Sequence, residues 1–73
     1  MDRQIYLNIR RIRELKNLTR EFVAAELNMS PSGYGKIERG EVDITISRLY
    51  QISDVLDVPL SSVLHLDISK LFC

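Results

Sequence analysis

Apolar residues at the start of the chain recur with the period of an α-helix. Ile5, Ile9 and Ile12 stand at positions i, i+4 and i+7, so they form one stripe along a helical face. The pattern predicts a first helix over residues 2 or 3 to 16. Asn17 is its expected end.

A second helix is predicted over residues 20–27. Thr19 precedes it as a candidate N-cap, because its hydroxyl oxygen can accept a hydrogen bond from a free amide of the first turn. Val23, Ala24 and Leu27 have the spacing of one buried face. Ala24 is the informative residue, because a small side chain lets another helix cross closely.

A third helix follows after a short turn. Asn28 is placed to turn the chain, Ser30 to cap the next helix, and Pro31 to occupy its first position, where a missing N–H costs little. The helix is predicted over residues 31–39, with Gly40 as its stop. Its inward residues are Tyr34 and Ile37. Two helices joined in this way form a helix-turn-helix, although an ordinary helical hairpin in an all-α domain explains the same spacing.

Two further helices complete a predicted all-α, five-helix chain. Thr45 is the expected N-cap of a fourth helix, and Pro59 prevents its continuation. A short fifth helix is predicted over about residues 60–66, with Val63 and Leu64 closing the core. The fourth helix carries the most regular apolar stripe, which consists of Ile46, Leu49, Ile52, Val55 and Leu56.

Composition narrows the class of protein. Seventy-three residues suffice for one domain, and the longest apolar run, residues 22–25, is too short to span a membrane. The single cysteine, Cys73, has no internal disulfide partner, so a reducing, cytoplasmic setting is expected. One histidine and one cysteine leave no catalytic Ser-His-Asp or Cys-His set, and His65 lacks companions for a metal site. We therefore expect neither an enzyme nor a cofactor.

The formal net charge is zero, whereas DNA-binding domains are often basic. The charges are unevenly distributed, however. Residues 1–20 contain six Lys or Arg and two acids, and residues 21–73 contain four and eight. The basic part includes Arg10, Arg11, Arg13, Lys16 and Arg20. Such a run suits either a solvated helix face or a surface that binds phosphate.

A family resemblance runs through the predicted helices. It is carried by Ile9, Ile12-Arg13, Leu18-Thr19, Val23-Ala24, Leu27, Met29-Ser30 and the segment KIERG at 36–40. Over about residues 5–66 the chain closely resembles the Cro and lambda-repressor family of helix-turn-helix domains, of the xenobiotic-response-element type. The resemblance implies a compact five-helix domain, usually dimeric, that places its third helix in the DNA major groove.

The resemblance also implies roles for individual residues. It pairs an arginine at the position of Arg13 with the glutamate at the position of Glu38, which would tie the first helix to the third. Arg20 stands where a contact to a backbone phosphate is expected; a plain surface arginine is the alternative. The implied DNA-binding residues are Thr19, Arg20, Ser30, Pro31, Ser32, Gly35, Lys36 and Arg39.

The sequence departs from the family pattern at the expected DNA face. Pro31 has no side-chain donor, and Gly33 and Gly35 have no side chain. The bare backbone either lets the helix approach the groove closely or is tolerated for packing. Glu41 and Asp43 follow where the family often has basic residues, so they argue against close contact there. The hydrogen-bonding residues that remain for base edges are Ser32 and Lys36.

Two functions are consistent with these features. The first is a sequence-specific, DNA-binding transcriptional regulator, a homodimeric repressor on a two-fold symmetric operator, with no membrane or small-molecule partner expected. The second is a protein-interaction module with weak DNA affinity, such as an antitoxin bound to its toxin or a controller protein that touches polymerase. Residues 1–66 would form the domain. The apolar tail, residues 67–73, would either join the dimer interface or fold back onto its own domain.

Overall fold

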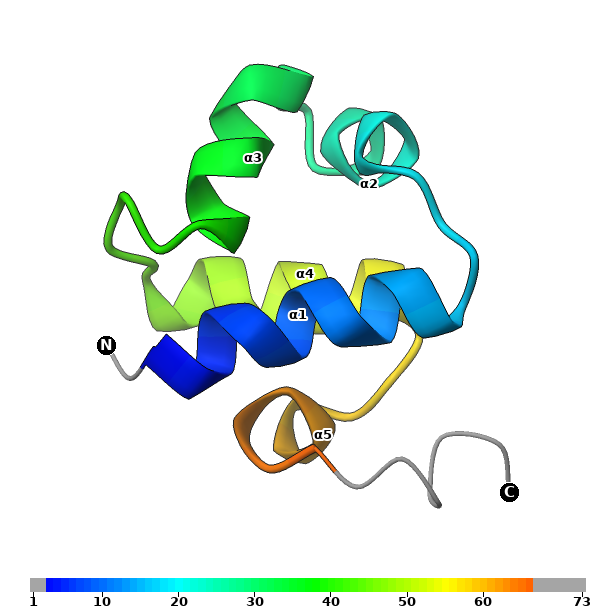
Figure 1. Cartoon of the computed structure of the whole chain (residues 1–73), viewed down its shortest axis with the longest axis vertical. Helices are drawn as coiled ribbons and strands as arrows, with labels where there is room; N and C mark the ends of the chain where they lie inside the picture. Colours follow the sequence, from blue (N-terminus) through cyan, green and yellow to red (C-terminus); the bar gives the residue numbers. More distant parts are fainter. Residues whose placement is uncertain (1–2, 67–73) are drawn as a thin grey trace.

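The computed structural model describes residues 3–66 and contains five helices and no strand within that range (Figure 1). The tail at 67–73, and with it the expected role in a dimer interface, lies outside the described residues. The helices are α1 (Arg3–Leu15), α2 (Arg20–Glu26), α3 (Pro31–Glu38), α4 (Ile46–Leu56) and α5 (Leu60–Leu64). Each predicted helix is present, with ends that differ by one or two residues.

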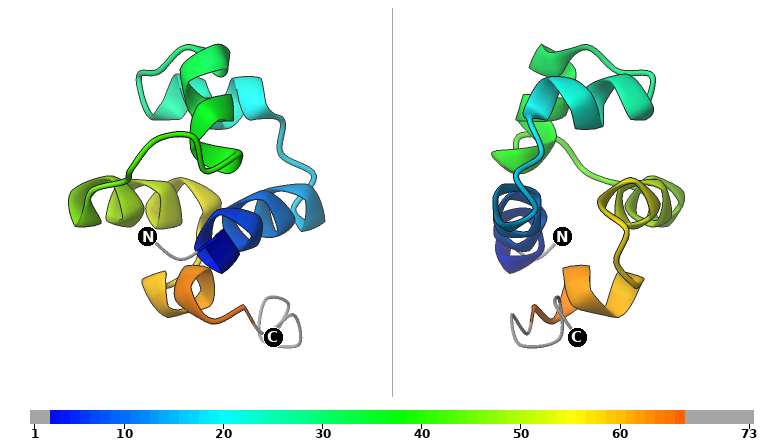
Figure 2. Two further views of the ribbon diagram at one scale, coloured as in Figure 1. Left: turned by 60° about the vertical axis from the view of Figure 1, so that its left-hand side comes forward. Right: turned by 90° about the vertical axis from the view of Figure 1, so that its right-hand side faces the viewer.

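Two helices form the middle of the molecule. In Figure 1, α1 and α4 lie across the centre, α2 and α3 occupy one end, and α5 occupies the other. The turned views in Figure 2 show the same separation of the α2–α3 end from α5. α3 packs on α2 and α1, while α5 packs on α1 and α4. The helix-turn-helix therefore projects from a three-helix base.

The apolar stripes predicted from the sequence meet in one core. Its largest members that are fully shielded from solvent include Tyr34, Ile9 and Ile12. Ala24 is also fully buried, in the helix that packs most extensively on α3, as its small size predicted. The complete cluster is Tyr6, Ile9, Ile12, Val23, Ala24, Leu27, Tyr34, Ile37, Ile44, Leu49, Ile52, Leu56 and Val63.

Side-chain caps begin three of the helices. The hydroxyl oxygens of Thr19, Ser30 and Thr45 accept hydrogen bonds from backbone amides three residues further on, at 3.0, 3.0 and 3.1 Å. Each bond satisfies an amide that has no partner within its own helix. All three predicted N-caps are confirmed, and Pro31 occupies the first turn of α3.

Left-handed residues end the helices and turn the chain. Asn17, Asn28 and Asp57 have φ of 58°, 57° and 57°, and Gly40 has φ of 71°. The predicted ends at Asn17 and Gly40 and the turn at Asn28 are confirmed. The left-handed Asp57 was not foreseen, because the sequence alone favoured Pro59 as the stop.

Two apolar residues lie further outside than their patterns predicted. Ile46 is 62% exposed and Leu64 36%. The prediction that Ile46 and Leu64 help to form the core is wrong. Ile46 is the first residue of α4, and Ile44 in the preceding loop is buried in the core instead. α5 is only five residues long and buries a single side chain, that of Val63.

Within residues 3–66 there is no helix with the length and apolarity needed to cross a membrane. Across the same part of the chain, no group of three or more His, Cys, Asp or Glu side chains is placed to hold a metal ion.

Substitution of Gly40 should destabilise the fold. A Cβ at this position would lie 3.0 Å from Cδ2 of Tyr6, and alanine resists the left-handed conformation by about 1–2 kcal/mol. We therefore expect Gly40→Ala to lower the free energy of unfolding by at least about 1 kcal/mol in urea titrations. Gly35→Ala is the matched control, since the nearest atoms to the added methyl belong to the exposed, flexible side chain of Arg39 and alanine favours a helix by about 1 kcal/mol. Equal losses for both variants would contradict this account.

Candidate nucleic-acid interface

A buried ion pair connects the base of the molecule to α3. Nε of Arg13 lies 2.6 Å from Oε2 of Glu38, and Nη2 donates to Oε1 at 3.2 Å. The two side chains are only 8% and 5% exposed. Nη1 of Arg13 also donates to the backbone oxygen of Leu18 at 2.9 Å. One guanidinium therefore joins the end of α1, the chain that leads into α2, and the last residue of α3.

This pair fixes the orientation of α3. Two parallel hydrogen bonds between a guanidinium and a carboxylate define angle as well as distance. The hydrogen bond to Glu38 raises the pKa of Arg13, and burial only partly offsets that effect. Both groups must remain ionised and paired, because an uncompensated buried charge is strongly destabilising.

Tyr34 lies in the core close to the same pair. Its side chain is fully buried, and its hydroxyl makes no hydrogen bond of acceptable geometry. Burial raises the pKa of Tyr34 far above its usual value, and the nearby Glu38 carboxylate adds to the effect. The core therefore retains a polar group that contributes no hydrogen bond to the fold.

The expected reading residues lie along one face of α3. Ser32, Lys36 and Arg39 fall at i, i+4 and i+7, and all three are exposed, as this spacing allows. Tyr34 and Ile37, on the opposite side, are buried. The hydroxyl groups of the two N-caps, Thr19 and Ser30, are already engaged by backbone amides, and Pro31 is exposed.

Gly35 differs from the other expected contact residues because it is buried. The side chain nearest to its face is that of Arg39, whose Nη1 lies 3.0 Å from the place of a Gly35 Cβ. The absence of a side chain thus lets the guanidinium of Arg39 fold back over α3. Packing was one of the two alternatives for this glycine, but the sequence pattern alone could not identify Arg39 as the side chain packed on it.

Three arginines converge on one cavity. It has a volume of about 170 Å³ and is lined by Arg10, Arg20, Gly35, Glu38 and Arg39. The arginines come from three different helices or their ends, and each is about half-exposed. Arg10 belongs to the basic run noted in the sequence but was not among the residues that the family resemblance implied as DNA contacts. The excess of basic residues over positions 1–20 was the signal that could have identified it.

A second hollow runs beside α3. It is lined by Gly33 and Lys36 of α3, by Asp43 of the following loop and by Arg48 of α4, among others. The volume is about 420 Å³. Lys36 is therefore separate from the arginine cavity but belongs to the same helix.

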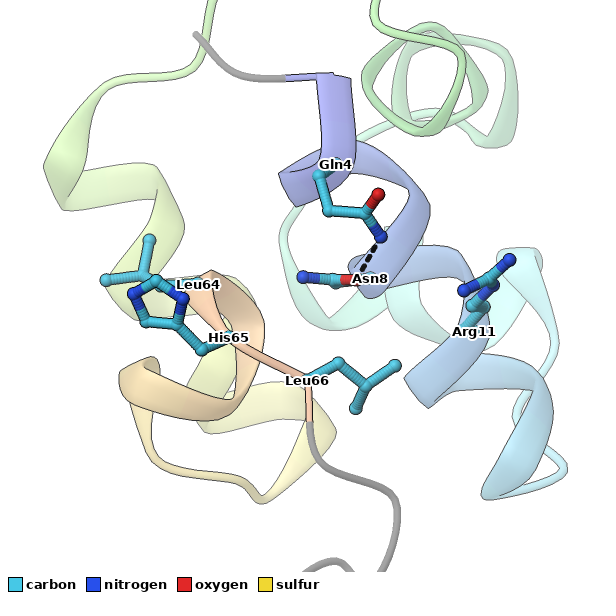
Figure 3. A pocket seen from close by; sticks show the side chains of 6 residues that line it. All are labelled: Gln4, Asn8, Arg11, Leu64, His65 and Leu66. Carbon is cyan, nitrogen blue, oxygen red and sulfur yellow. Dashed lines mark hydrogen bonds between the residues drawn. The ribbon is translucent and has the colours of Figure 1, made fainter.

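Arg11 lies elsewhere. It lines a hollow of about 400 Å³ between α1 and α5, with Asn8, His65 and Leu66 among its neighbours (Figure 3). Asn8 is anchored there by a 2.8 Å hydrogen bond from Nδ2 to the backbone oxygen of Val63. The basic residues of α1 therefore divide between two regions, and Arg10, not Arg11, joins the arginines of the helix-turn-helix.

Removal of the Tyr34 hydroxyl should leave the fold intact at neutral pH. Tyr34→Phe deletes a buried group that has no hydrogen bond, so we expect the free energy of unfolding to stay equal or rise by about 1 kcal/mol.

The same variant should change the response to alkali. Above about pH 10 the unfolded chain loses the Tyr34 proton while the folded chain keeps it, so the wild type loses stability as the pH rises. Tyr34→Phe should lose less between about pH 9 and 11, as measured by urea titration. Tyr50→Phe, on an exposed side chain, is the control. Parallel pH curves for wild type and Tyr34→Phe would contradict the assignment.

Comparisons with known proteins agree with this geometry. The chain has the fold of a solved protein described as the clp gene regulator ClgR from C. glutamicum, with a TM-score of 0.80 and 24% sequence identity over 85% of this chain and 82% of that one. No curated protein gives a significant match. The sequence model of the helix-turn-helix family, of the Cro/C1 type, matches residues 9–63, which include α2, α3 and the Arg13–Glu38 pair. The chain therefore belongs to the Cro/C1-type helix-turn-helix family.

Proposed function

We propose that the chain is a sequence-specific DNA-binding regulator of transcription, which acts as a homodimeric repressor at a two-fold symmetric operator. Family membership supports the general class of DNA-binding regulator. The named neighbour is a gene regulator, which is consistent with this class. We add to this class the proposals that the protein is a homodimer, that its operator is symmetric and that it represses transcription.

One observation carries the proposal. Arg10, Arg20 and Arg39 meet at a single cavity, next to the exposed face of α3 that bears Ser32 and Lys36. Phosphate contacts position a protein on a duplex, whereas contacts to base edges read the sequence. The arginine cavity is suited to the first task and the polar side chains of α3 to the second.

The two exposed residues of α3 that have side-chain donors, Ser32 and Lys36, would share the recognition of bases. Lys36 can donate to O6 and N7 of guanine, and Ser32 can bond to several bases. Pro31 offers apolar contact only. Thr19 and Ser30 would hold the first turns of α2 and α3 close to phosphates while they serve as caps. Gly35 would come into contact with DNA only after Arg39 moves off it.

A limited set of base contacts favours binding as a dimer. Two copies double the contacts, and half-sites should lie roughly 34 Å apart, one turn of the duplex. Ile46 and Tyr50, one turn apart on α4, are 62% and 55% exposed. Exposed apolar side chains of this kind can bury area between two copies, which a small domain needs.

A second candidate function rests on a different observation. Phe22 is 45% exposed on α2, although a large aromatic side chain gains from burial. A protein-interaction module, such as an antitoxin or a controller protein that touches polymerase, would use such a residue for its partner. In that case Phe22→Ala would abolish partner binding and leave the binding of DNA unchanged.

Selection from a random pool of DNA duplexes at two salt concentrations tests the proposal. Enrichment of a two-fold symmetric site, with affinity that falls steeply as salt rises, would support it. Absence of enrichment at the lower salt would favour the protein-interaction module.

Loss of the Lys36 side chain should weaken sequence discrimination. We expect Lys36→Ala to lower the affinity for the selected site by about 1–3 kcal/mol and to relax the preference at one base pair. Arg11→Ala removes the same charge from the α1–α5 side and should have a much smaller effect. Equal losses on selected and scrambled duplexes would argue against base reading by Lys36.

Loss of the Arg20 side chain should act on all sequences alike. Arg20→Ala removes one expected phosphate contact, so affinities for selected and scrambled duplexes should fall by the same factor. The slope of log affinity against log salt should become shallower by about 0.9. Fluorescence anisotropy over a salt series measures both effects, and an unchanged slope would exclude a phosphate contact.

A further inference from the structure

Every arginine at the cavity beside α3 is paired with a carboxylate of its own chain. The pairs are Arg10 with Glu14, Arg20 with Glu38, and Arg39 with Glu41. A guanidinium binds carboxylate and phosphate through the same fork of donors. The Arg39 guanidinium donates a hydrogen bond to Glu41, and the other two pairs are ion pairs at 3.6 and 3.8 Å, so an acid stands beside the donors of each arginine that a DNA phosphate would use.

We infer that Glu14 and Glu41 compete with the phosphodiester backbone for Arg10 and Arg39, and so limit the affinity of this interface. The inference rests on the proposed DNA-binding function and adds to it a mechanism that keeps the interaction weak and reversible. The occupant of the arginine cavity is one phosphate of duplex DNA, which displaces both carboxylates when it binds.

An incoming anion can break the Arg10–Glu14 and Arg39–Glu41 pairs, because both are exposed to solvent. Side chains of Arg10 and Glu14 are each 52% exposed, and those of Arg39 and Glu41 are 56% and 49% exposed. Exposed ion pairs contribute little to stability. In the Arg10–Glu14 pair, 3.6 Å apart, the acid follows the base along the helix, which is the weaker order.

Glu38 cannot take part in the same exchange. Its side chain is 5% exposed and is bound through both oxygens by Arg13. Arg20 reaches it only as a second, more distant partner, with Nε at 3.8 Å from Oε1. Arg20 therefore remains the least constrained donor, and we assign it the first contact with an incoming phosphate.

The position of Arg39 is held from two sides. Glu41 binds the guanidinium, and the bare backbone of Gly35 leaves room for it against α3. This holds the side chain at the edge of the cavity, where a phosphate oxygen can replace the carboxylate oxygen. Glu41 is thus expected to have a larger effect on affinity than Glu14.

Asp43 provides a matched control. It stands two residues after Glu41 in the same exposed loop and has the same charge. It lines the neighbouring hollow with Lys36, not the arginine cavity, and it forms no ion pair within residues 3–66. Asp43→Asn therefore measures the general effect of removing one acid near the duplex.

The test compares the full chain and its Glu41→Gln, Glu14→Gln and Asp43→Asn variants on one labelled duplex of scrambled sequence. We expect Glu41→Gln to bind about two- to fivefold more tightly than Asp43→Asn, the range that matches the loss of an exposed ion pair. In the wild type, Glu41 takes up a salt cation when Arg39 leaves it for a phosphate, and this uptake offsets one of the cations released from DNA. Glu41→Gln removes that uptake, so the slope of log affinity against log salt should steepen by up to about 0.9. Glu14→Gln should show a smaller gain.

If Glu41 competes with phosphate, the gain in DNA affinity of Glu41→Gln must depend on Arg39. In an Arg39→Gln background, Glu41→Gln should bind no more tightly than Asp43→Asn in that background. If Glu41→Gln equals Asp43→Asn when Arg39 is present, the competition is overturned while the proposed DNA-binding function still stands. A gain that persists without Arg39 also overturns it, since the effect is then one of general charge.

A second probe separates this inference from the proposed function. Inorganic phosphate is titrated while the Nε–Hε signals of the arginines are followed by NMR. If no variant binds any duplex, the proposed function fails. The phosphate titration then shows by itself whether Glu41 competes with phosphate for Arg39. Phosphate binding at Arg39 that is tighter in Glu41→Gln than in Asp43→Asn supports it, and equal binding overturns it.

Discussion

The arrangement of this domain depends on the buried pair between Arg13 and Glu38. Two hydrogen bonds fix the C-terminal end of α3 against the end of α1, and a third from the same guanidinium reaches the backbone of Leu18. α2 and α3 are only seven and eight residues long, so this pair adds a directional contact to the apolar packing that holds them on α1 and α4. Replacing such a pair by apolar residues can be neutral in stability. Its value here is geometric, since it sets the direction in which Ser32 and Lys36 face.

The same glutamate links the structural pair to the exposed surface. Glu38 lies at the floor of the arginine cavity and touches Arg20 as well as Arg13. Around this centre, basic and acidic side chains are distributed so that the chain as a whole is neutral. A neutral chain can still present a basic surface, but its strength depends on how readily nearby acids release the arginines. We infer that Glu41 acts on the binding surface, whereas the backbone of the same loop is tied to the fold, because the oxygen of Val42 accepts a hydrogen bond from the Tyr6 hydroxyl at 3.4 Å.

Local sequence signals were sufficient for most of the fold. The helix starts could be predicted from the hydroxyl groups of Thr19, Ser30 and Thr45. The turns could be predicted from the backbone preferences of Asn17, Asn28 and Gly40. These features depend on near neighbours in the chain, so they can be read without knowing the tertiary structure. The exposure of Ile46 could not be read in this way, because it depends on Ile44 in a loop. The convergence of Arg10 with Arg20 and Arg39 joins three separate helices, and the burial of Gly35 depends on the path taken by Arg39.

The central claim is that the α2–α3 end of the molecule, and not the α5 end, faces DNA. Backbone amide NMR shifts, recorded while a selected duplex is added to the full chain, test this most directly. We predict the largest changes at the backbone amides of residues 19–22 and 30–36, with little change over residues 60–64. Changes concentrated on α5, with residues 19–22 and 30–36 unaffected, would contradict the claim.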